Sequence, residues 1–132
     1  MKPDAAFAPG FRISELDVAF IIAAVLLSIL LARSSEQLSL AVLFAVSHFF
    51  LFCNILRAKR ALELLWAATF VGLWSASYVW GVPTWPQTYA IALVATVVVA
   101  VVQVLLPSYH GAFWSTLNPR LPQWWEQNGG AA

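Results

Sequence analysis

Residues 45–65 read AVSHFFLFCNILRAKRALELL, an apolar run that is interrupted by the three cations of RAKR and then resumes. Long apolar runs on either side of a short basic turn are typical of two membrane helices joined at a membrane surface. The stretch therefore predicts a helical hairpin. It also raises the question of whether the polar residues within the first run, His48, Cys53 and Asn54, form a site.

The composition of the whole chain agrees with a membrane location. Of its 132 residues, 61% are hydrophobic and only 10% are charged, against about 25% charged in ordinary soluble domains. The mean hydropathy is +0.79. Seven Lys and Arg residues against six Asp and Glu residues give no basic surface for nucleic acid. We therefore expect one integral-membrane domain that is embedded in the lipid bilayer.

Four transmembrane helices follow from the uncharged intervals, since about 20 apolar residues cross a bilayer core of roughly 30 Å. They are expected at 14–33, 37–56, 61–81 and 88–106. Ser14 and Asp17 are expected to form a capping box where the first helix begins. Pro83 and Pro86 divide the long interval after Glu63. The sequence thus predicts an all-α four-helix bundle at 14–106, between an N-terminal segment at 1–13 and a tail at 107–132.

The distribution of cations predicts the orientation of this bundle. In the four-span arrangement only Arg33 lies on one side of the membrane. The other side carries Lys2, Arg12, Arg57, Lys59, Arg60 and Arg120. Cytoplasmic loops carry the excess of Lys and Arg, so we expect both termini in the cytoplasm, in a bacterial inner or intracytoplasmic membrane.

Small residues spaced four apart mark one face of each predicted helix. Such rows let helix backbones approach closely in lipid, and they predict the packing faces of the bundle. Gln103 continues the row of the last helix and is expected to bond across a helix interface. The rows are Ala24, Ser28 and Ala32; Ala41 and Ala45; Ala68, Gly72 and Ala76; and Ala92, Thr96 and Ala100.

The hairpin at 45–65 suggests two hydrogen bonds between its helices. A turn at 57–60 places His48 level with Thr69, and Asn54 level with Glu63. Two interhelical bonds, His48 to Thr69 and Asn54 to Glu63, would account for all four residues. The alternative is that His48 is a proton relay or a ligand to a tetrapyrrole, because an ionisable residue at mid-depth is a functional candidate.

A haem held by two histidines of one chain is not expected, because His110 follows the fourth helix at a different depth from His48. A chlorophyll-type pigment needs one imidazole and remains open, although the sequence requires no cofactor. No catalytic pair is apparent, since Cys53 and His48 are turned about 140° from each other on a helix. We therefore do not expect an enzyme or a metal centre.

The basic turn and the tail are the remaining candidate surfaces. The basic turn contains Arg57, Lys59 and Arg60, whose main expected role is to set the orientation of the helices in the membrane. These cations could also bind a lipid head group or an acidic partner. The tail is rich in aromatic residues that favour the membrane interface or a neighbouring subunit. The tail residues expected to contact the interface or a partner are Phe113, Trp114, Trp124 and Trp125.

Two functional classes follow from this pattern. The first is a small non-catalytic accessory subunit of a larger integral-membrane complex of respiratory or photosynthetic type. The second is a small homo-oligomeric transporter or channel. A pigment-binding membrane subunit that uses His48 is an intermediate possibility. The scarcity of paired ionisable groups within the spans favours the accessory subunit.

Overall fold

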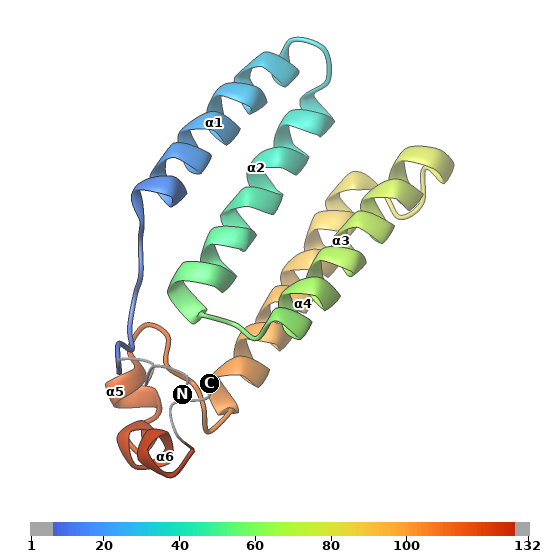
Figure 1. The fold of residues 1–132 in the computed structure, drawn as a ribbon. Helices are drawn as coiled ribbons and strands as arrows, with labels where there is room; N and C mark the ends of the chain where they lie inside the picture. Colours follow the sequence, from blue (N-terminus) through green and yellow to red (C-terminus); the bar gives the residue numbers. More distant parts are fainter. Residues whose placement is uncertain (1–6, 129–132) are drawn as a thin grey trace.

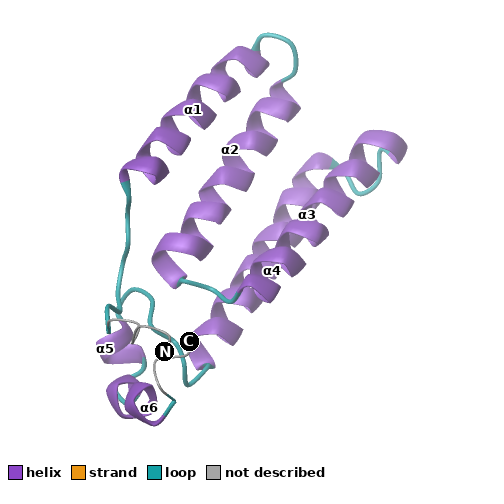
Figure 2. Cartoon of the chain, in the orientation of Figure 1, coloured by secondary structure: helices purple, strands orange, loops and turns teal. Residues whose placement is uncertain are grey.

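The computed structural model describes residues 7–128, and every regular element in that range is a helix (Figures 1 and 2). Four spans within it are long and apolar enough to cross a membrane, which confirms the predicted all-α membrane fold. In chain order the elements are α1 (Glu15–Ala32), α2 (Glu36–Phe50), the π-helix η1 (Leu51–Leu56), α3 (Arg60–Trp80), α4 (Trp85–Leu105), α5 (Trp114–Leu117) and α6 (Leu121–Gln127). Helix α2 and η1 together form one of these four spans, Glu36–Leu56.

Local sequence signals set most of the helix ends. Helix α1 begins at the expected capping box, in which the Ser14 backbone N–H donates to Asp17 Oδ2 at 2.7 Å. Helix α3 ends at Gly81, whose φ of 70° is a left-handed conformation that glycine adopts without steric cost. Helix α4 begins three residues earlier than expected, at Trp85. Pro86 lies in its first turn, where no backbone N–H is needed for the helix.

The four long helices form two antiparallel hairpins, α1–α2 and α3–α4 (Figure 1). A hydroxyl pair joins the helices within each hairpin. Ser28 Oγ lies 2.7 Å from Ser39 Oγ in the first hairpin, and Ser77 bonds to Thr88 in the second. Small hydroxyl residues allow both close backbone approach and a hydrogen bond in lipid, so each hairpin is a tightly packed unit.

The contact between the two hairpins differs from the contact within them. The backbones of α2 and α3 stay apart and aromatic side chains fill the space, with Phe52, Trp66 and Phe70 in the buried core. The small residues of α3 do not pack there. Ala68 and Gly72 are exposed, because Trp66 and Phe70 take the inward face of this helix. The expectation that the α3 row packs inside the bundle is therefore wrong for Ala68 and Gly72, whereas Ala76 is half-buried.

The N-terminal segment, the turn after η1 and the tail meet at one end of the molecule (Figure 1). Backbone hydrogen bonds join these segments: Gly10 N–H donates to His110 O at 2.8 Å, and Ala112 N–H donates to Ile55 O at 2.7 Å. The tail thus folds back against the end of the second span instead of continuing α4.

Candidate functional site

A layer of aromatic rings joins the two hairpins. Phe44, His48 and Phe52 recur every four residues, and their side chains point from the second span toward α3. The His48 ring stacks on Trp66 with 4.6 Å between centroids and 9° between planes. Phe44 lies 5.1 Å from Phe70, and Phe52 lies 5.4 Å from Trp66. Such pairs add stabilisation beyond their buried area.

Trp66 is the central residue of this layer. Its indole Nε1–H donates to Thr96 Oγ1 at 2.9 Å and to Ala92 O at 3.2 Å, so it reaches α4 as well as α2. It is only 5% exposed. Trp66 is not among the residues predicted from the sequence, because small residues served there as the markers of helix packing. The spacing of Trp66 and Phe70, four apart on one helix face, was the signal that could have found it.

The hydrogen-bond partner of His48 differs from the one predicted from the sequence. Its Nδ1 lies 2.7 Å from Phe44 O on its own helix. A carbonyl only accepts, so Nδ1 carries the proton and a neutral ring keeps its lone pair on Nε2. The expected bond to Thr69 is wrong, since Thr69 Oγ1 donates to Leu65 O at 2.8 Å. The aromatic layer keeps the two backbones too far apart for the short Thr69 side chain to bridge.

The expected bond between Asn54 and Glu63 is also wrong. Glu63 accepts from Cys53 Sγ at 3.2 Å and lies 3.8 Å from Arg60 Nη1. The amide nitrogen of Asn54 is buried and has no hydrogen-bond partner among the described residues. The physical reason is η1: a π-turn contains more residues than an α-turn, so the side chains after Phe50 are rotated and Cys53 faces α3.

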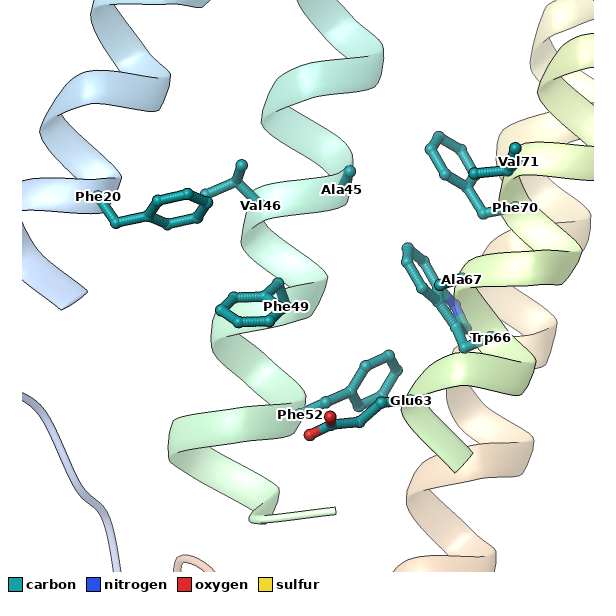
Figure 3. A pocket seen from close by; sticks show the side chains of 10 residues that line it. All are labelled: Phe20, Ala45, Val46, Phe49, Phe52, Glu63, Trp66, Ala67, Phe70 and Val71. Carbon is teal, nitrogen blue, oxygen red and sulfur yellow. The ribbon is translucent and has the colours of Figure 1, made fainter. Parts of the chain in front are cut away.

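An apolar cavity of about 260 Å³ opens beside the aromatic layer (Figure 3). Phe20 reaches it from α1, and the other lining side chains come from the second span and α3. Glu63 is the charged residue among them and lies at the end nearest the turn. The cavity is lined by Phe20, Ala45, Val46, Phe49, Phe52, Glu63, Trp66, Ala67, Phe70 and Val71.

Gln103 ties α4 to the basic turn. It is 1% exposed, and its Oε1 accepts from the Lys59 backbone N–H at 3.2 Å. Its Nε2 donates to Arg57 O at 3.3 Å. The side chain therefore satisfies backbone groups that η1 and α3 leave unpaired at the turn, instead of bonding to another side chain. Arg60 is also at this turn, and its side chain is 81% exposed.

The tail residues split into contacting and exposed groups. Trp114 and Trp125 pack edge-on against Phe7, with 5.8 and 5.5 Å between ring centroids. Trp124 is half-buried, whereas Phe113 is 80% exposed. Two of the four predicted interface residues thus contact the chain's own N-terminal segment, and Phe113 stays available for lipid or a partner.

Burial and neighbouring charges shift the pKa values of His110 and Arg57, which lie where the tail meets the turn. Burial lowers the pKa of His110 most, the hydrogen bond to Ser108 O partly opposes this shift, and the nearby Arg57 charge lowers the pKa further. The ring therefore favours its neutral form. Burial lowers the pKa of Arg57 as well, and the charge of Arg12 adds to this effect. A guanidinium remains protonated despite such shifts. Two like charges are therefore held near each other at this end of the molecule.

Within residues 7–128, no group of three or more His, Cys, Asp or Glu residues is arranged to hold a metal ion. Comparisons of the chain with protein-family models, curated proteins and solved structures found no match.

Proposed function

We propose that this chain is a small non-catalytic accessory subunit of a larger integral-membrane complex of respiratory or photosynthetic type. The observation that carries the proposal is the outward small-residue row of α3. Ala68 and Gly72 are exposed, and a Cβ added to Gly72 would meet nothing within 4 Å. Small residues at this spacing are what a second membrane helix packs against. The exposed small residues of α3 therefore favour the presence of a partner helix on this face.

The polar groups of the spans support a structural role over a transport role. Ser28 bonds to Ser39 within one hairpin, and Ser77 bonds to Thr88 within the other. These hydroxyls satisfy one another, as expected of helix packing, whereas a transport path needs polar groups that face a water-filled cavity. The cavity beside Trp66 is apolar and suits a hydrocarbon or aromatic occupant.

The proposed orientation has both termini in the cytoplasm of a bacterial inner or intracytoplasmic membrane. Arg33 lies just past α1, at the end of the molecule opposite the tail (Figure 1). The other described cations, Arg12, Arg57, Lys59, Arg60 and Arg120, belong to the tail end. Lys2 lies outside the described residues. The excess of Lys and Arg on cytoplasmic loops supports this assignment, with the aromatic tail along that interface.

The accessory-subunit proposal is tested by replacing Gly72 with leucine. The added side chain occupies the groove that a partner helix needs, so we expect recovery of the intact complex in mild detergent to fall by roughly tenfold, the change that about 1.4 kcal/mol produces. Size-exclusion chromatography and mass spectrometry of the co-purifying chains provide the measurement. Ala90→Leu on the exposed face of α4 is the matched control and should leave the complex intact.

Two outcomes would contradict this proposal. If the wild-type chain purifies as a homo-oligomer without another subunit, the transporter or channel becomes the better assignment. If Gly72→Leu and Ala90→Leu affect assembly equally, the α3 row is an ordinary lipid-facing surface and the partner helix lies elsewhere.

A pigment-binding subunit is the second candidate, and His48 is the residue that favours it. Metal-ligating histidines commonly donate one ring N–H to a carbonyl and present the other nitrogen to the metal. The bond from Nδ1 to Phe44 O has this form. If this function holds, His48→Ala should lower the Soret or Qy absorption of the purified complex. Thr69→Ala, the control on the facing helix, should not. An unchanged His48→Ala spectrum would remove His48 from pigment binding.

A further inference from the structure

A second cavity, of about 540 Å³, lies where the N-terminal segment, the basic turn and the tail come together. It is independent of the α3 row on which the proposed function depends. Four of its lining residues are cations, Arg12, Arg57, Lys59 and Arg60, and no carboxylate lines it among the described residues. His110 contributes an imidazole from the tail. Three of the cations come from the turn at 57–60, and the fold brings Arg12 and His110 to them from distant parts of the sequence.

Most of these cations have no carboxylate partner. In residues 7–128 the ion pair that the structure contains joins Arg60 to Glu63 at 3.8 Å. Arg12 interacts with the charge of Asp17 at a longer distance, whereas Arg57 and Lys59 have no carboxylate within ion-pair distance. Arg57 is half-buried, and its pKa is lowered by burial and by the charge of Arg12. Holding like charges together is unfavourable unless an anion lies between them. The cavity therefore has the electrostatics of an anion site.

The backbone around the cavity is held in place before any ligand arrives. Arg57 has a left-handed φ of 49°, and its Nη1 donates to Ala8 O at 2.6 Å. Gln103, on α4, bonds to Arg57 O and to the Lys59 N–H. A guanidinium has five N–H donors, so Arg57 keeps others for a ligand after its bond to Ala8. Preorganised donors bind an anion with little ordering cost.

We propose that this cavity binds a phosphate group, carried either by an anionic lipid head group or by free phosphate. Guanidinium groups match the oxygens of phosphate through paired N–H donors, and Lys59 adds a point charge. The position at the end of the spans is the depth at which lipid phosphates lie, and basic pockets between membrane helices are known to take anionic head groups. Ser108, which is 3% exposed, is also among the residues that line the cavity.

The test uses the full-length protein in a neutral detergent and two probes. The first is an equimolar mixture of phosphatidylglycerol and phosphatidylcholine, with bound lipid counted by native mass spectrometry. The second is inorganic phosphate, with thermal stability compared against chloride at equal ionic strength. We expect Lys59→Gln to reduce the preference for the anionic probe about fivefold, the effect typical of one cation near a membrane surface. Arg12→Gln should do the same. Both residues are exposed, so neither variant removes a core contact.

Arg33→Gln and Arg120→Gln remove the same charge outside the cavity and serve as controls. Selective lipid binding without stabilisation by phosphate identifies the head group as the source of the ligand. Stabilisation by phosphate without lipid selectivity identifies free phosphate. The proposal is overturned if neither probe is preferred, or if control and cavity variants lose binding equally. It is also overturned if the cavity variants keep both probes and instead release co-purifying chains, which would assign the cavity to an acidic partner.

Discussion

Trp66→Ala is expected to lower the free energy of unfolding by about 3–5 kcal/mol, the usual range for removing a buried tryptophan side chain. The substitution removes the ring that stacks on His48 at 4.6 Å and on Phe70 at 5.4 Å between centroids. It also removes the indole N–H that donates to Thr96 on α4. Since aromatic contacts join α2 to α3, we expect the hairpins to separate before either hairpin unfolds. Denaturation by SDS in mixed micelles measures the loss of stability.

Two control variants separate the contributions of Trp66. Trp66→Phe keeps an aromatic ring and loses the N–H donor, and Thr96 Oγ1 retains its own bond to Ala92 O at 2.8 Å. This variant should cost only about 1 kcal/mol for the lost donor, plus a smaller packing change. Trp80→Ala removes a tryptophan that is 75% exposed at the end of α3 and should change stability by less than about 0.5 kcal/mol. If Trp66→Ala behaves like Trp80→Ala, the aromatic layer does not hold the hairpins together.

Gly111→Ala is expected to detach the tail from the end of the second span. A Cβ at this position would lie 2.6 Å from Leu56 O and 2.7 Å from Ile55 O. Both are backbone atoms, and the adjacent bond from Ala112 N–H to Ile55 O keeps the two segments close. Overpacking of this kind costs about 1–3 kcal/mol. Limited proteolysis should therefore cut the tail of the variant near residue 111 several times faster than that of the wild type.

Gly72→Ala provides a matched control for this prediction. The same methyl group meets nothing within 4 Å at Gly72, which lies in the middle of α3. Alanine is the better helix former by up to about 1 kcal/mol, so the isolated protein should be unchanged or slightly more stable. Equal rates of tail proteolysis in Gly111→Ala and in the wild type would show that the tail does not need the close approach at Leu56.

Several local features could be predicted because they depend on short stretches of chain. The capping box of Ser14 and Asp17 needs two residues three apart, and the structure contains it. The break after Trp80 needs a glycine and two prolines, whose backbone preferences act over a few residues. Helix α4 begins earlier than the sequence predicts, because proline breaks a helix interior but is tolerated in a first helical turn.

The errors at the candidate site share one physical cause. Matching His48 to Thr69 and Asn54 to Glu63 by depth assumed regular α-helices in close backbone contact. The π-helix at Leu51–Leu56 rotates Cys53 into the place expected for Asn54. The aromatic layer separates the helices and gives His48 a tryptophan face instead of a hydroxyl. Neither effect is visible in residue spacing alone.

The apolar runs alone are enough to predict an all-helical chain with four helices of membrane-spanning length. That result depends on the cost of leaving unpaired backbone groups in hydrocarbon and on the length of each apolar run, which are properties of single segments. Which helix faces meet depends on the tertiary structure. It turned the small residues of α3 outward, placed Trp66 between the hairpins and gathered Arg12, Arg57 and His110 around one cavity. These arrangements depend on contacts between segments distant in sequence, where large side chains displaced the packing that small residues predicted.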